Sequence, residues 1–173
     1  MQRTRGFNLL ELMTTITVLG VLTTVAVGPV RNGLERAQTR SAMAQVHLAL
    51  KLGRQSAVYH QQLVTICPLD TKQQCSNDWN GELTVFLDPF NSREVTQDEQ
   101  VIERFPGVAH GKLQAAPAWK SYFQFTTRGS SHGTLGHVRY CPDRQTAAAL
   151  IVVSMSGRSR SEWLDNTKPP LSC

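Results

Sequence analysis

The spacing of apolar residues divides this 173-residue chain into three parts, and the first is a long uninterrupted apolar run. Residues 12–30 contain no Asp, Glu, Lys, Arg or His, and three further apolar residues extend the run toward the N-terminus. A helix of about 20 apolar residues is long enough to span a bilayer. We therefore predict a membrane-spanning helix over residues 7–30. Gly28-Pro29 is expected to bend it near its end, because proline lacks a backbone donor.

Beyond residue 30 the apolar residues recur at helical spacing, and charged residues occupy positions between them. The recurring small or apolar positions are Leu34, Ala37, Ala42, Val46, Ala49, Leu50, Gly53 and Ala57. This periodicity is typical of an amphipathic helix. We predict that residues 31–59 continue the first helix and lay one face against a sheet.

After Tyr59 the helical spacing stops, and short runs typical of β-strands follow, separated by turn residues. The predicted strands are Gln62–Cys67, Leu83–Leu87, Val101–Phe105, Ser121–Phe125, His137–Cys141, Ala148–Ser154 and Arg158–Trp163. The predicted fold class is therefore α+β. A long N-terminal helix packs its second half on antiparallel sheets, which form a β domain over residues 60–173.

Charge is distributed unevenly over a chain whose formal net charge is +5. Residues 7–103 hold 7 basic and 10 acidic residues, whereas residues 104–173 hold 9 basic and 3 acidic residues. A basic C-terminal half favours a polyanionic partner or an anionic surface. An ordinary basic surface without such a partner is the alternative.

The four cysteines, Cys67, Cys75, Cys141 and Cys173, favour two disulfides in an exported domain. Four cysteines allow 3 pairings, among which sequence alone does not decide. We expect Cys67–Cys75, which closes a short polar loop, and Cys141–Cys173, which ties down the end of the chain. A zinc site is disfavoured, because there is no C-x-x-C pair and no histidine at finger-like spacing.

No motif in the sequence indicates catalysis. The chain lacks a G-x-S-x-G elbow, an HExxH pair, a phosphate-binding G-x-x-x-x-G-K-[ST] loop and a G-x-G-x-x-G fingerprint. His110, His132 and His137 could cluster, but residues 129–133 are more simply a turn between strands. The acidic loop after Asp88 lacks EF-hand spacing, which favours a solvated loop over a calcium site. We therefore expect no enzymatic activity, metal or cofactor.

The N-terminal residues Arg5-Gly6-Phe7-Asn8-Leu9-Leu10-Glu11-Leu12 resemble the processing signal of type IV prepilins and type II secretion pseudopilins. The resemblance implies that residues 1–6 are a leader, which a prepilin peptidase removes by cutting between Gly6 and Phe7. It also implies N-methylation of Phe7. The basic leader fits a cytoplasmic location, which places the rest of the chain across the inner membrane in a single pass with a periplasmic domain.

Glu11 is costly in a membrane helix unless it finds a partner. The resemblance implies that its carboxylate pairs with the N-terminal amine of a neighbouring pilin, where an unpaired charge would be unfavourable. The expected partners are thus the inner membrane, the prepilin peptidase and other major and minor pilins. After assembly the chain is expected in a pilus fibre or at its tip.

The segment Ala149–Arg160 is similar to the C-terminal pattern of the GspH/FimT family of minor pilins and pseudopilins. The patches that agree elsewhere are Val64–Cys67 followed by Cys75, then Trp79–Gly81 and Val85–Asp88. In the FimT branch a G-R-x-R element is associated with DNA binding during natural transformation. Gly157, Arg158 and Arg160 match its three fixed positions.

The chemistry of this element agrees with a DNA partner. In an extended segment Arg158 and Arg160 project to the same side, about 6.5–7 Å apart. Guanidinium groups bind phosphate oxygens bidentately, so binding should be independent of DNA sequence. Other basic residues that could extend the patch are Arg139, Arg144, Lys168, Lys112, Lys120 and Arg128.

The resulting hypothesis is a minor type IV pilin that binds extracellular DNA for uptake in natural transformation. The alternative is a structural minor pilin or pseudopilin. It would prime assembly of a pilus or of a type II secretion pseudopilus without binding DNA.

Overall fold

The computed structural model of this chain describes residues 8–133, 135–142 and 149–164, without the side chains of residues 23–29, 31 and 32. The predicted leader and cleavage site lie outside the described residues, as do the predicted site residues Gly6, Phe7, Arg144, Lys168 and Cys173. The chain divides into two compact units, Met1–Ala37 and Gln38–Cys173.

The predicted N-terminal helix is present as α1 (Leu9–His60), a single helix of 52 residues. It continues without interruption through Gly28 and Pro29. Among the described side chains of the first unit, the exposed large apolar ones are Leu9, Leu10, Leu12, Met13, Ile16, Val18, Leu19, Val21, Leu22, Val30 and Leu34. Among the described residues, no helix is both long enough and apolar enough to cross a membrane.

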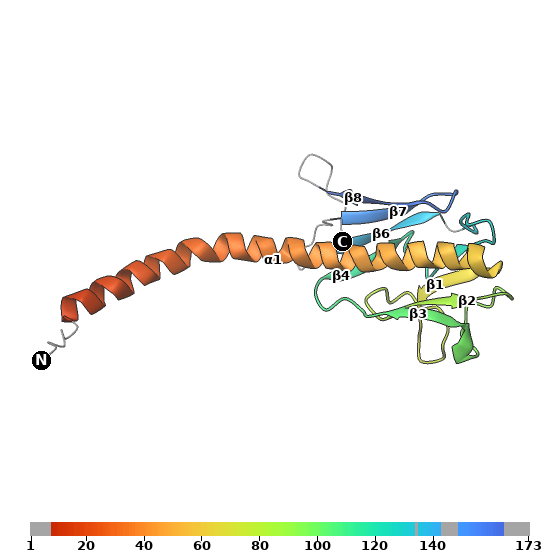
Figure 1. Cartoon of the computed structure of the whole chain (residues 1–173), viewed down its shortest axis with the longest axis horizontal. Coiled ribbons are helices and arrows are strands. Elements are labelled where there is room, and N and C mark those ends of the chain that lie inside the picture. Colours follow the sequence, from red (N-terminus) through yellow and green to blue (C-terminus); the bar gives the residue numbers. More distant parts are fainter. Residues whose placement is uncertain (1–7, 134, 143–148, 165–173) are drawn as a thin grey trace, which may run out of the picture. The chain divides into compact units, whose positions relative to one another are not determined.

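The second unit contains two antiparallel sheets of four strands, in the orders β3-β2-β1-β5 and β4-β6-β7-β8. Their strands are β1 (Val64–Pro68), β2 (Leu83–Leu87), β3 (Val101–Phe105), β4 (Lys112–Ala116), β5 (Phe123–Phe125), β6 (Gly136–Cys141), β7 (Ala149–Val153) and β8 (Ser159–Trp163). A short 3-10 helix, η1 (Asp98–Gln100), precedes β3. The α+β fold with a helix packed on antiparallel sheets is confirmed (Figure 1).

One strand was missed by the sequence prediction. β4 pairs with β6 and alternates in burial, with Leu113 and Ala115 buried and their neighbours more exposed. Its alanines favour strands only weakly, so the alternation was the available signal. The other predicted strands are all present, with ends that differ from the prediction by at most two residues.

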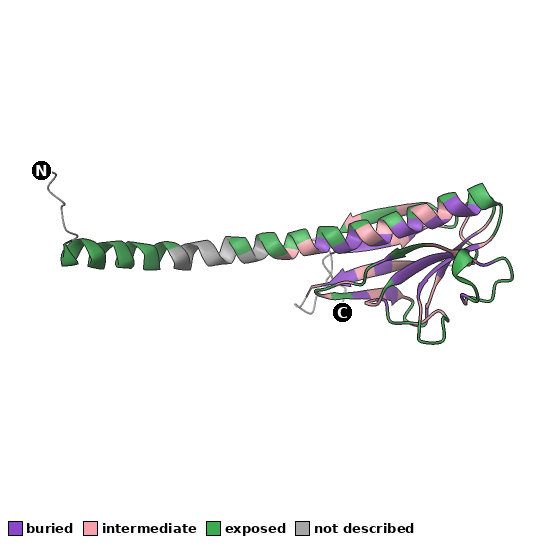
Figure 2. Ribbon diagram, turned by 60° about the horizontal axis from the view of Figure 1, so that its bottom comes forward, coloured by how far each residue is buried: buried purple, intermediate pink, exposed green. Residues whose placement is uncertain are grey.

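The predicted amphipathic face of α1 forms one side of the core (Figure 2). Ala42, Val46, Ala49, Leu50 and Ala57 are buried and belong to one apolar cluster with residues of both sheets. The cluster members from the strands include Val64, Ile66, Val85, Phe123, Phe125, Val138, Tyr140, Ile151 and Val153. Each buried aliphatic or aromatic side chain contributes about 1.5–3 kcal/mol, so this shared cluster is what holds helix and sheets together.

A disulfide braces the start of the β domain. Cys67 and Cys75 are bonded with their Cα atoms 5.5 Å apart, as predicted. Cys141 is also disulfide-bonded, and its predicted partner Cys173 lies outside the described residues. Cys67 packs in a small apolar cluster with Phe86 and Val95, so the bond joins the first sheet to the loop that follows β1.

Candidate functional site

The predicted Gly-Arg-x-Arg element lies at the turn that joins β7 to β8. The backbone N–H of Ser154 donates to the Arg158 carbonyl oxygen at 2.9 Å, and Gly157 N–H donates to the Ser154 carbonyl oxygen at 2.9 Å. The Ser154 hydroxyl donates to the Arg158 carbonyl oxygen at 3.0 Å and accepts from the Arg158 N–H at 3.2 Å. β8 begins at Ser159, so Arg158 belongs to the turn and not, as predicted, to the strand.

Gly157 is buried where this turn meets the loop that follows β5. Its φ is +74°, a conformation that L-residues rarely adopt. A Cβ at this position would lie 1.9 Å from the carbonyl oxygen of Gly129. Glycine is therefore required here for two reasons, the backbone angle and the close approach of the two loops.

One hydrogen bond joins these two loops, and a second ties the loop after β5 to α1. The backbone N–H of Ser131 donates to the Met155 carbonyl oxygen at 3.0 Å. From α1, Arg54 Nε donates to the Gly129 carbonyl oxygen at 2.8 Å. Arg128 is exposed and directly precedes Gly129, so its backbone lies next to the contact with the β7–β8 turn. Arg54 was not predicted as a neighbour of this site.

Strand register shows which way Arg160 faces. Its neighbour Ser159 lies within 3.4 Å of His47 on α1, oxygen to Nδ1, so Ser159 is on the helix side of the sheet. Successive side chains of a strand point to opposite faces. Arg160 therefore lies on the face turned away from α1, and Glu162, two residues further on, shares that face.

The arginines of the element are exposed but not equivalent. Arg160 Nη2 lies 2.9 Å from Glu162 Oε1, and the two side chains are 75% and 30% exposed. Arg158 Nε donates weakly to the Ser156 hydroxyl at 3.4 Å. Beside them is an open hollow of about 460 Å³, lined by Val152, Ser154, Arg158, Ser159 and Arg160. Its chemistry suits a phosphate, because two guanidinium groups border it.

Two other residues of the predicted basic patch, Arg139 and Lys112, are directed or placed away from the β7–β8 turn. Arg139 pairs with Leu150 in register and so shares the face of Arg160, but its Nε donates to Gln114 Oε1 at 3.0 Å, toward β4. Burial, and then the charge of Arg139, lower the pKa of His137 on the same strand. Lys112 pairs with Cys141, at the end of the sheet away from the β7–β8 turn.

Lys120 does not lie on the surface where it was predicted. Its residue is buried, its Nζ donates to the Leu135 carbonyl oxygen at 2.6 Å and its ammonium lies 4.8 Å from the centre of the Phe123 ring. Burial lowers the pKa of Lys120 to about 8. Its backbone carbonyl also accepts a bond from Trp79 Nε1, so Lys120 is part of the core and we leave it out of the basic patch.

In the predicted acidic loop after β2, the Asp88 carboxylate accepts hydrogen bonds from groups of the protein itself. Asp88 is buried, and its Oδ2 accepts from the Thr65 hydroxyl at 2.7 Å, Gln124 Nε2 at 3.2 Å and Arg93 N–H at 3.1 Å. Its Oδ1 accepts from Ser92 N–H at 2.8 Å. Asp88 therefore organises the loop, which is a structural role.

Comparison with known proteins identifies relatives of the second unit. Residues 42–157 match the family described as Type II transport protein GspH. A crystal structure of the Pseudomonas aeruginosa (strain PAO1) type IV minor pilin FimU is similar, with a TM-score of 0.60 and 22% identity over 80% of this chain and 97% of that one. A second crystal form of FimU gives 0.57 and 21% over 78% and 98%. No curated protein matches the chain.

These similarities support the fold and the family, but they do not test the role of Arg158 and Arg160. The matched family segment ends at Gly157, so Arg158 and Arg160 lie just beyond it. The identity to FimU is low enough that the likeness concerns the fold alone.

Proposed function

The chain belongs to the GspH family, and from this membership we propose that it is a minor type IV pilin or pseudopilin. In this role other subunits carry it into a fibre, and its β domain is displayed on the fibre. The proposal concerns assembly and binding, not catalysis. The FimU crystal structures support it through the shared fold.

We propose further that the first half of α1 is the membrane and assembly segment, released from its leader between Gly6 and Phe7. Its apolar side chains are exposed in the isolated chain, which suits burial in lipid or among other subunits. Two of its threonines bond to the helix backbone: the Thr14 hydroxyl donates to the Glu11 carbonyl oxygen at 3.0 Å and the Thr15 hydroxyl to that of Leu12 at 2.8 Å. Glu11, in the first turn, then remains for the N-terminal amine of a neighbouring subunit.

The finer proposal is that the β domain binds the phosphate backbone of DNA for uptake. The observation that carries it is the exposure of two arginines, Arg158 in the β7–β8 turn and Arg160 at the start of β8, beside a contact in which Gly157 meets the loop bearing Arg128. Phosphate contacts of this kind are sequence-independent and weaken with salt.

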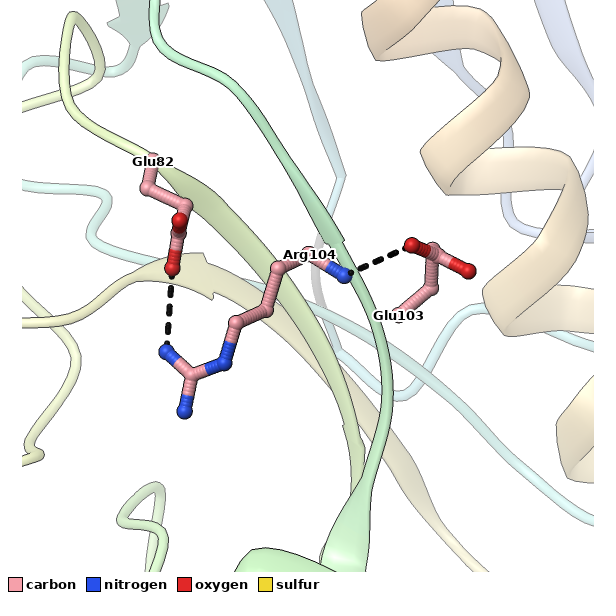
Figure 3. A network of polar contacts seen from close by, with 3 residues as sticks. All are labelled: Glu82, Glu103 and Arg104. Carbon is pink, nitrogen blue, oxygen red and sulfur yellow. Dashed lines mark hydrogen bonds and ion pairs between the residues drawn. The ribbon is translucent and has the colours of Figure 1, made fainter.

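The test is a DNA titration of the full chain in a mild non-ionic detergent, with Arg158→Gln plus Arg160→Gln. We expect the double variant to lose most of its affinity while its unfolding curve is unchanged. A control of equal charge is Arg93→Gln plus Arg104→Gln, which removes two positive charges from the loop after β2 and from β3. Arg104, like Arg160, pairs with a glutamate: its Nη1 lies 3.0 Å from Glu82 Oε1 (Figure 3).

If the Arg158/Arg160 variant binds as tightly as the parent, or no more weakly than the control variant, the proposed DNA site is wrong. The assembly role is separable from this result. A deletion strain that loses pili or secretion, rather than DNA uptake alone, favours the structural role without DNA binding.

A further inference from the structure

Arg160 already has an anionic partner, and this changes how the proposed DNA site should behave. We infer that Glu162 competes with DNA phosphate for the Arg160 guanidinium and thereby limits the affinity of the hollow between Arg158 and Arg160. The inference rests on the proposed function and adds to it a residue that opposes binding. Family resemblance does not suggest this residue, because it lies beyond the G-R-x-R pattern.

The geometry makes the competition direct. Arg160 and Glu162 occupy alternate positions of β8, on the face turned away from α1, and Arg160 Nη2 lies 2.9 Å from Glu162 Oε1. Val152, opposite Arg160 in the strand register, lines the hollow and offers no charge. A phosphate held by Arg160 must therefore displace the Glu162 carboxylate or lie beside it.

The charges around the hollow explain why Glu162 should lower its affinity for phosphate. Arg158 and Arg160 bring two positive charges to the hollow, and Glu162 returns one negative charge next to it. Exposed Arg–carboxylate pairs are weak, and breaking one changes an equilibrium by about 1.5- to 5-fold. Both the ion pair and the repulsion between carboxylate and phosphate are screened by salt, so the effect of Glu162 should fade as salt rises.

The experiment compares Glu162→Gln with Glu82→Gln in the full chain, using a labelled duplex and the corresponding single strand as probes. Glu82 is the partner of Arg104 on the other sheet, so both variants remove one carboxylate charge from an Arg–Glu ion pair (Figure 3). At about 50 mM salt we expect Glu162→Gln to tighten binding about 2- to 5-fold and Glu82→Gln to change it little. At about 200 mM salt the gain should shrink.

A double-variant cycle separates competition from general repulsion. In an Arg160→Gln background, Glu162→Gln should tighten DNA binding by less than half as much as in the parent, because the guanidinium for which Glu162 competes is gone. A gain that survives in full, or no gain from Glu162→Gln in the parent, overturns the inference. Glu162→Thr repeats the test with a residue that strands favour, and unfolding curves check that each variant is folded.

The outcomes also distinguish the two proposals. If the parent binds DNA and Glu162→Gln binds no more tightly, only the competition is wrong. If neither binds DNA, the proposed function and the inference fail together. If Glu162→Gln binds and the parent does not, the competition stands and the parent's DNA binding is refuted.

Discussion

Replacing Gly157 by alanine tests how the proposed site is held in shape. The new Cβ would lie 1.9 Å from the Gly129 carbonyl oxygen, so the two loops must separate by more than 1 Å to reach ordinary contact. Separation strains the Arg54–Gly129 bond of 2.8 Å and the Ser131–Met155 bond of 3.0 Å. An alanine at φ +74° also costs about 1–2 kcal/mol on its own.

A second glycine isolates the cost of the backbone angle. Gly133 has φ +63°, and a Cβ there would meet no atom within 4 Å. Gly133→Ala should therefore lower the free energy of unfolding by about 1–2 kcal/mol, through strain alone. Gly157→Ala should lower it by about 2–4 kcal/mol, because one or two hydrogen bonds worth about 0.5–1.5 kcal/mol each are weakened in addition.

The assay is urea unfolding of the full chain in detergent, followed by tryptophan fluorescence. Trp79 is buried against Phe123 and reports on the core of the β domain. The midpoint should fall with little change in the denaturant slope. If Gly157→Ala is no more destabilising than Gly133→Ala, the close contact between the two loops does not contribute as described.

Two further predictions concern stability. The pKa of Lys120 is lowered by burial from 10.5 to about 8, so the folded state releases this proton first and stability should rise between pH 8 and 10.5. Relative to Lys120→Met, the parent should gain about 3 kcal/mol over that window in urea titrations, and a constant difference would contradict the buried ammonium. Cys67→Ala plus Cys75→Ala opens a disulfide with a sequence separation of 8 and should lower the free energy of unfolding by about 2.5 kcal/mol. A loss below about 1 kcal/mol in the same assay would show that this bond constrains the unfolded chain little.

Local pattern was sufficient for most of the fold. β2 and β3 were predicted to the residue, because short runs that favour strands are bounded there by turn residues such as Asn80-Gly81 and Pro106-Gly107. The buried stripe of α1 followed from helical spacing, although Leu34 and Ala37 are exposed because the core begins after them. β4 was missed because Ala115 and Ala116 have little preference for strands.

The site was only partly predictable. Spacing placed Arg158 and Arg160 together, and the same period-two spacing would have placed Glu162 beside Arg160. Arg54 lies 75 residues from Gly129 in the sequence, and only the packing of α1 on the sheets brings them together. Nothing in the sequence indicated that Lys120 is buried, because lysine rarely lies inside a protein. Here the Leu135 carbonyl oxygen accepts a hydrogen bond from its ammonium.

The salt dependence of duplex binding tests the central claim most directly. Each phosphate contact contributes about 0.9 to the slope of log affinity against log salt. Arg158→Gln plus Arg160→Gln should therefore flatten the parent's slope by about 1.8 and weaken binding at low salt, while Arg93→Gln plus Arg104→Gln leaves both nearly unchanged. Equal slopes and equal affinities for the parent and the Arg158/Arg160 variant would contradict DNA binding at the β7–β8 turn.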